Sequence, residues 1–227
     1  MPDIRTFVDN PSEQMPVDLL LARSGHPFKG KNAKTPHPGA HIAFGTAYEN
    51  WPQGGEAPSN YPPILAVADG VVSKVIDTAA DGPNDYYGVH LTIAASGTAP
   101  IDFEYRLEPM TKEPSAGFYA SFITVKVGDR VKRGDVIGYV YLPDGVDGSL
   151  LHFNLVNTAT GEPMAPAIFS GPTIAAFYGT WKEQGFDSTE GFTDPIPICI
   201  GWKIDASENP YENRAEECLA LPGSQVG

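Results

Sequence analysis

Glycine and proline interrupt this sequence so often that few helices of ordinary length can form. The chain of 227 residues contains 24 Gly and 22 Pro. Both residues disfavour helix interiors and are typical of turns. Between them lie short runs rich in β-branched and aromatic residues, which are typical of strands. The sequence therefore predicts a mostly β fold.

Short apolar or alternating runs bounded by turn residues locate the expected strands. Eight segments fit this description: His41–Gly45, Ile64–Ala68, Val71–Asp77, Val89–Ala94, Ile101–Leu107, Phe122–Val127, Val136–Leu142 and Leu150–Val156.

One segment has a helical period and lies beyond the last expected strand. Ser170 can cap it, Pro172 can occupy its first turn, and Gly185 can end it. Its apolar residues are spaced i, i+3, i+4 and i+7, at Ile174, Phe177, Tyr178 and Trp181. We therefore expect one short C-terminal helix.

The pattern divides the chain into an N-terminal arm (1–30), a β core (31–169) and a C-terminal extension (170–227). The only two cysteines, Cys199 and Cys218, lie in this extension. One disulfide would help to hold such a Gly- and Pro-rich tail, and two separate reduced thiols are the alternative.

The charge balance excludes some partners. Lys and Arg number 15 against 28 Asp and Glu, which gives a formal charge of -13. Such a protein would be repelled by a nucleic-acid backbone and by an anionic membrane surface. No stretch approaches the roughly 20 apolar residues that a membrane-spanning helix needs. We therefore expect neither nucleic-acid binding nor a membrane span.

Two stretches of the core echo each other, at 64–76 and 123–140. Each reads as a strand, a glycine-centred turn and a second strand. This resembles the hybrid motif of biotinyl and lipoyl carrier domains, of the glucose-permease enzyme IIA and of lysostaphin-type zinc endopeptidases. A carrier domain needs a modifiable lysine in the hairpin, where this chain has Ala68, Asp69 and Gly70, so the carrier interpretation is excluded.

Six motifs occur in the order and spacing of the lysostaphin-type family across residues 37 to 166. They are "HPGAH" (37–41), "VADGV" (67–71), "EYRL" (104–107), "VKVGDRVKRGDVIG" (125–138), "LLHFN" (150–154) and "GEPMAP" (161–166). The resemblance implies an antiparallel β sandwich of the duplicated hybrid motif type. It also implies a secreted or periplasmic metallopeptidase-like hydrolase that uses zinc to cut the peptide of bacterial cell walls.

The resemblance further implies that His37, His41 and His152 bind the metal, with His41 at the position of the family's aspartate. Two histidines that handle protons in the family are replaced by Arg106 and Leu150. Zinc ligation could therefore persist, whereas the inherited mechanism could not.

The spacing of the first two histidines also requires a bend. Four residues of extended strand span roughly 13 Å, which is too far for both imidazoles to reach one ion at about 2.0–2.1 Å. Pro38 and Gly39 can supply the bend. Three neutral imidazoles leave a fourth position open for water, the layout of catalytic zinc. The alternative is a solvated surface turn.

Strand alternation gives a check that is independent of the family. It places His90, Glu104, Arg106 and His152 on one polar sheet face, opposite the apolar residues of the same strands. Arg106 could hold a carboxylate or stabilise an oxyanion, and Glu104 or His90 could transfer protons. The alternative is an exposed Glu104–Arg106 pair and a surface histidine.

These observations leave three functions open. The first is a secreted zinc hydrolase with an altered active site that acts on cell-wall peptide or a related polymer. The second is a catalytically degenerate binding or regulatory protein of the same fold. The third is a metal-assisted polysaccharide lyase, in which the metal and Arg106 would neutralise an acidic sugar.

Overall fold

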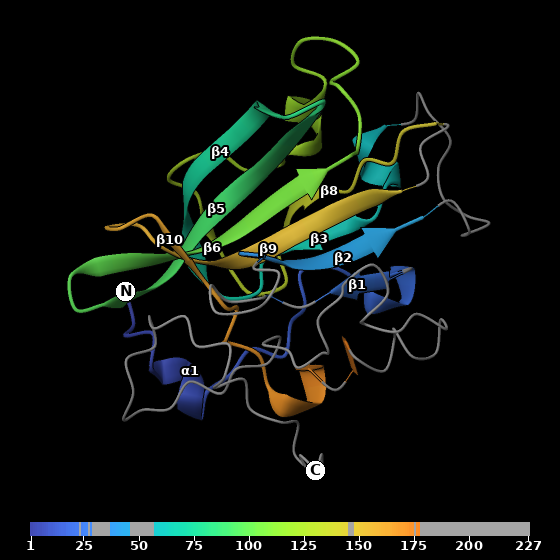
Figure 1. Ribbon diagram of the computed structural model, residues 1–227. Coiled ribbons are helices and arrows are strands. Elements are labelled where there is room, and N and C mark those ends of the chain that lie inside the picture. The colour runs from blue at the N-terminus through green and yellow to red at the C-terminus, as the bar shows by residue number, and fades with distance from the viewer. Residues whose placement is uncertain are drawn as a thin grey trace.

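The computed structural model describes residues 1–22, 24–26, 28, 37–45, 57–144, 148–174 and 176–177 (Figure 1). The expected helix residues Tyr178 and Trp181, its end at Gly185 and both cysteines lie outside these residues.

A curled antiparallel sheet forms the centre of the molecule (Figure 1). Its strands follow the order β1 (Ser24–His26), β2 (Ala40–Phe44), β9 (Ser149–Asn157), β6 (Ala99–Glu108), β5 (Asn84–Ser96), β4 (Gly70–Asp81) and β7 (Arg130–Val131). The short strand β10 (Glu162–Met164) pairs with β9, and β3 (Pro63–Leu65) pairs with β8 (Val136–Tyr139) in a second sheet. The predicted mostly β, antiparallel fold is confirmed.

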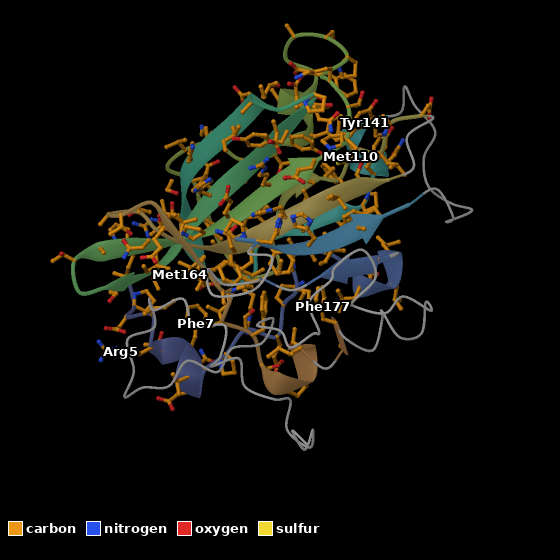
Figure 2. All side chains as sticks on the ribbon, viewed as in Figure 1. Arg5, Phe7, Met110, Tyr141, Met164 and Phe177 are labelled. Carbon is orange, nitrogen blue, oxygen red and sulfur yellow. The ribbon has the colours of Figure 1, made fainter. Side chains whose placement is uncertain are left out.

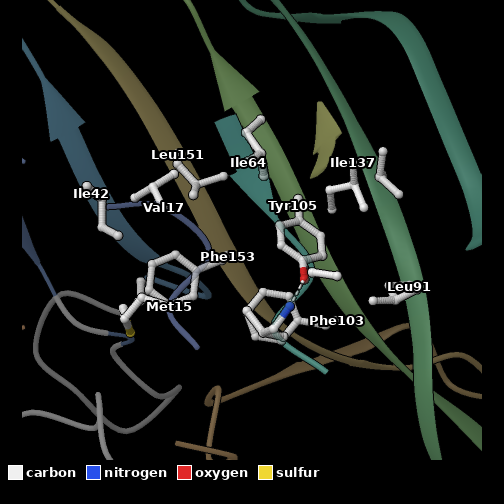
Figure 3. Packing of buried hydrophobic residues seen from close by; sticks show 14 of the residues in the cluster. Met15, Val17, Ile42, Ile64, Leu91, Phe103, Tyr105, Ile137, Leu151 and Phe153 are labelled. Atoms are coloured by element: carbon white, nitrogen blue, oxygen red, sulfur yellow. Dashed lines mark hydrogen bonds between the residues drawn. The ribbon is translucent and has the colours of Figure 1, made fainter. Parts of the chain in front are cut away.

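The apolar face of the main sheet packs against the second sheet, the N-terminal segment (residues 1–22) and residues 164–174. Tyr105 of the main sheet lies near Ile64 of β3 and Ile137 of β8, and Phe153 lies near Met15 of the N-terminal segment (Figure 3). Burial of these side chains supplies the main free energy of folding. The opposite face of the same strands is left for polar residues.

The alternation expected on β6 is present. Phe103, Tyr105 and Leu107 are buried in the core, while Glu104 and Arg106 point to the other face because neighbouring residues of a strand face opposite sides. The hydroxyl oxygen of Tyr105 accepts a 2.8 Å hydrogen bond from the Val67 amide.

The short helices are α1 (Thr6–Asp9), η1 (Leu19–Leu21), η2 (Pro58–Asn60) and η3 (Tyr119–Phe122). A further helical segment covers 171–174 and 176–177. Its predicted start is confirmed, because Ser170 Oγ accepts a 3.3 Å hydrogen bond from the amide of Thr173. Phe7 of α1, Met164 of β10 and Phe177 of the C-terminal helical segment (labelled in Figure 2) pack into or against the hydrophobic core. No helix in the described ranges is long and apolar enough to cross a membrane.

Seven of the eight predicted strands overlap strands of the structure, but the strand predicted at Phe122–Val127 is wrong. Phe122 ends η3, and Ile123 makes a single bridge to Gly138. The Asp129 carboxylate then accepts a hydrogen bond from the amide of Lys126 at 3.0 Å. Such a side-chain turn competes with strand pairing. Helix α1 was not predicted either; it is a single short turn of four residues.

Candidate metal centre

Two histidines lie side by side on neighbouring strands of the main sheet. His41 of β2 is the direct antiparallel partner of His152 of β9. Their neighbours Ile42 and Leu151 are buried in the core, so both imidazoles project from the opposite, polar face. The two side chains are still only 7% and 8% exposed.

His37 joins this pair through the bend that its spacing requires. Its Nε2 lies 3.1 Å from Nε2 of His41, and the latter lies 2.8 Å from Nδ1 of His152. Gly39 is essential to this approach, because a Cβ atom at that position would lie 2.1 Å from ring atoms of His152. The structure therefore brings all three predicted ligands together.

The donor set fits a zinc ion. One nitrogen of each imidazole lies within 4.8 Å of the others. Zn–N bonds of about 2.0–2.1 Å in a tetrahedral site separate the nitrogens by about 3.3–3.4 Å, close to the two shorter distances in this group. In the described part of the chain this is the single group of three or more potential metal ligands. Three imidazoles and an open fourth position suit catalytic zinc.

The ring of His152 is held from behind by Asn154, two residues further along β9. The Oδ1 atom of Asn154 lies 3.0 Å from His152 Nε2. Nδ2 of the same amide donates a 2.9 Å hydrogen bond to the carbonyl of Leu155. Sequence reasoning missed this contact, because it treated Asn154 only as the end of a motif.

Arg106 lies next to the histidines but is engaged elsewhere. It is the direct β6 partner of His152. Its guanidinium forms ion pairs with Asp81 and, at 2.8 Å, with Glu108, and it stacks on the ring of Tyr86 at 4.0 Å. These partners neutralise its charge and fix its direction.

His90 and Glu104 form the next row on the same face. His90 of β5 pairs with Glu104 of β6, which in turn pairs with Asn154. His90 Nε2 lies 3.6 Å from the Glu104 carboxylate, and Nδ1 lies 3.8 Å from Asp102. Burial lowers the pKa of His90 because it disfavours the charged imidazolium, and the negative charge of Glu104 partly opposes this. The predicted shared polar face is therefore present.

Glu108 is a further residue of this face that sequence reasoning missed. It lies directly opposite Leu150, two residue pairs along from the Arg106–His152 pair. Burial raises the pKa of its carboxyl group above the usual value, and the positive charge of Arg106 opposes this. Extending the alternation of β6 by one more step, from Arg106 to Glu108, would have found it.

Comparison with protein-family models finds no match for this chain, and no curated protein matches it. Comparison with solved structures finds an M23 protein, a zinc containing peptidase and lysostaphin. One is a mutant catalytic domain of the prophage-encoded M23 protein EnpA from Enterococcus faecalis, at 19% identity and a TM-score of 0.35, covering 63% of this chain and 88% of that one.

Two further structures are similar. The catalytic domain of the antimicrobial peptidase lysostaphin from Staphylococcus simulans is 15% identical, with a TM-score of 0.34, and covers 70% of this chain and 94% of its own. A zinc containing peptidase from Vibrio cholerae is 19% identical, with a TM-score of 0.33, and covers 64% of this chain and 36% of its own. The ligand assignment rests on the histidine geometry itself.

Proposed function

We propose that the protein is a zinc-dependent hydrolase on a lysostaphin-type scaffold that acts outside the cytoplasm on cell-wall peptide or a related polymer. The observation that carries this proposal is the convergence of three imidazole nitrogens, from His37, His41 and His152, on one polar sheet face. The cell-wall substrate and the secreted or periplasmic location follow from the motif resemblance.

Zinc at this site would supply a Lewis acid and a water of lowered pKa. The three histidines would hold it without adding negative charge, so the bound water would be more acidic than beside a carboxylate ligand. This compensates for the lack of a nearby histidine base at Arg106 and Leu150. Hydrolysis also requires a residue that donates a proton to the leaving amine.

Glu108 is our candidate for the proton donor to the leaving amine. Its carboxyl group lies opposite Leu150, and burial raises its pKa toward the range in which it can hold a proton for transfer. Arg106 touches Glu108 at 2.8 Å and would orient this carboxyl group. Glu104 and His90, in the neighbouring row, are the alternative pair for proton transfer.

The test is hydrolysis of purified peptidoglycan by the zinc-loaded protein, followed by measurement of new amino groups and new reducing ends. We expect new amines that disappear with a chelator and with His41→Ala. Glu108→Gln should lower kcat while metal content stays unchanged. Absence of any product over a broad set of wall preparations, with one zinc bound per chain, would overturn the hydrolase proposal.

A second candidate function is a metal-containing binding protein of the cell wall that has lost catalysis. Two observations favour it: Leu150 is apolar at a position where the family has a working histidine, and Arg106 is already paired. This protein would sediment with cell walls and release no product. The lyase is not proposed, because the pair with Asp81 neutralises the cation that an acidic sugar would need.

A further inference from the structure

We propose that Asn154 is a positioning residue that fixes the tautomer of His152, so that Nδ1 and not Nε2 of this imidazole is the metal-binding atom. The proposal rests on the metal site of the proposed function, but not on hydrolysis.

The orientation of the Asn154 amide is set by the backbone. Its NH₂ group donates to the Leu155 carbonyl at 2.9 Å, which leaves the Oδ1 atom facing His152 Nε2 at 3.0 Å. An amide oxygen can only accept a hydrogen bond. Nε2 of His152 must therefore carry the hydrogen. Asn154 is fully buried, with 0% of its surface exposed, so water cannot readily replace this contact.

The consequence lies on the other side of the ring. With the hydrogen on Nε2, the neutral imidazole keeps its lone pair on Nδ1. That atom is the one that lies 2.8 Å from His41 Nε2, within the group of converging nitrogens. In the other tautomer an N–H bond would point into the group and exclude a cation. Asn154 thus prepares the site before the ion arrives.

The chemistry of the residue matters as well as its position. A hydrogen bond to the distal nitrogen of a ligating histidine orients the ring and raises its basicity, and loss of such a partner typically weakens metal binding by about 10–100-fold. A carboxylate here could also accept from His152 Nε2, but it would add a negative charge behind the ring and could not donate to the Leu155 carbonyl. The neutral amide orients His152 and leaves the positive charge of the centre undiminished.

Two measurements test the proposal, and neither requires activity. The first is the tautomer of His152 in the metal-free protein, from long-range nitrogen–proton NMR correlations of the imidazole. The second is the zinc dissociation constant, from competition with a chromophoric chelator. The variants are Asn154→Leu, which has a similar volume and no acceptor, and Asn154→Asp, which keeps the acceptor. Ser149→Ala is the matched control, because it removes a buried hydrogen bond of β9, to the Tyr141 carbonyl at 2.6 Å.

We expect the hydrogen on Nε2 of His152 in the wild type and in Asn154→Asp, and a mixture of tautomers in Asn154→Leu. Zinc affinity should fall about 10–100-fold in Asn154→Leu and recover in Asn154→Asp, and Ser149→Ala should bind as the wild type does. A wild-type hydrogen on Nδ1, or unchanged affinity in folded Asn154→Leu, would overturn the proposal. If Asn154→Leu does not fold, the wild-type tautomer decides. If the pattern holds and wall digestion fails, only the hydrolase proposal falls.

Discussion

Substitution of Gly39 by alanine should abolish the metal site by adding one methyl group. The new Cβ would lie 2.1 Å from Cε1 and Nε2 of His152 and 2.6 Å from Cδ2. Non-bonded carbon and nitrogen atoms cannot approach each other this closely. The imidazole must move, and it then loses both the Asn154 contact and its place among the converging nitrogens. Loss of a hydrogen-bond partner behind a ligating histidine weakens metal binding by up to about 100-fold. We expect the loss of zinc affinity in Gly39→Ala to be at least that large.

The size of the effect can be worked out as a metal-induced stabilisation. At zinc concentrations about 100 times the dissociation constant, the wild type gains about 2.7 kcal/mol. With 100-fold weaker binding, the same zinc concentration equals the dissociation constant and adds only about 0.4 kcal/mol. For a chain of this length, 1 kcal/mol corresponds to roughly 2–4 °C in Tm. Zinc should therefore raise Tm by about 5–11 °C in the wild type and by under about 2 °C in the variant.

The assay is thermal unfolding of each protein with zinc and with a chelator, so that each variant serves as its own reference. This matters because the added methyl group also costs about 1–3 kcal/mol by overpacking. Gly138→Ala is the control. Gly138 lies on β8 of the second sheet, and a Cβ atom there would lie 2.9 Å from the Phe122 carbonyl oxygen. It should lower Tm and keep the full zinc-induced rise. A Gly39→Ala protein that keeps the full rise would refute the reasoning.

Three further outcomes are expected. Tyr105→Phe should lower the free energy of unfolding in urea by about 1–3 kcal/mol, since it leaves the buried Val67 amide without its 2.8 Å partner; a neutral substitution would show that water replaces the hydroxyl. The pKa of His90 lies below 6.5 in the folded protein, so the unfolded chain binds a proton first and stability falls as the pH drops below about 6.5. His90→Gln should remove the part of this fall that begins near pH 6.5, and an unchanged slope would assign the fall to other groups. Glu108→Gln should lower kcat for peptide hydrolysis by about 10²–10⁴-fold without changing bound zinc, whereas unchanged kcat would transfer the proton-donor role to Glu104 or His90.

Much of the fold was predictable because its determinants are local. Alternation of apolar and polar residues in 101–107 and 150–156 indicated which side chains face the core, and the structure agrees. The Pro38–Gly39 step indicated a bend, and the structure brings His37 to His41. The strand predicted at Phe122–Val127 was wrong because the Lys126 amide donates its hydrogen bond to the Asp129 side chain and not to a neighbouring strand.

The contacts around the site were less predictable, because they depend on register between distant strands. The sequence indicates that Arg106 is on the polar face, but its pairing with Asp81 requires the position of the β4–β5 hairpin. The same applies to Glu108, whose importance comes from Leu150 on the neighbouring strand. The contact between Asn154 and His152 is local in sequence. Its role at a metal site can be recognised only once His152 is known to pair with His41.

The central claim is tested most directly by the metal itself. Metal analysis of the purified protein, combined with anomalous diffraction at the zinc edge, should show one zinc per chain bound by Nε2 of His37, Nε2 of His41 and Nδ1 of His152. Substitution of His41 by alanine should remove it. Zinc at another place, or no stoichiometric metal with the three imidazole nitrogens pointing apart, would contradict the account.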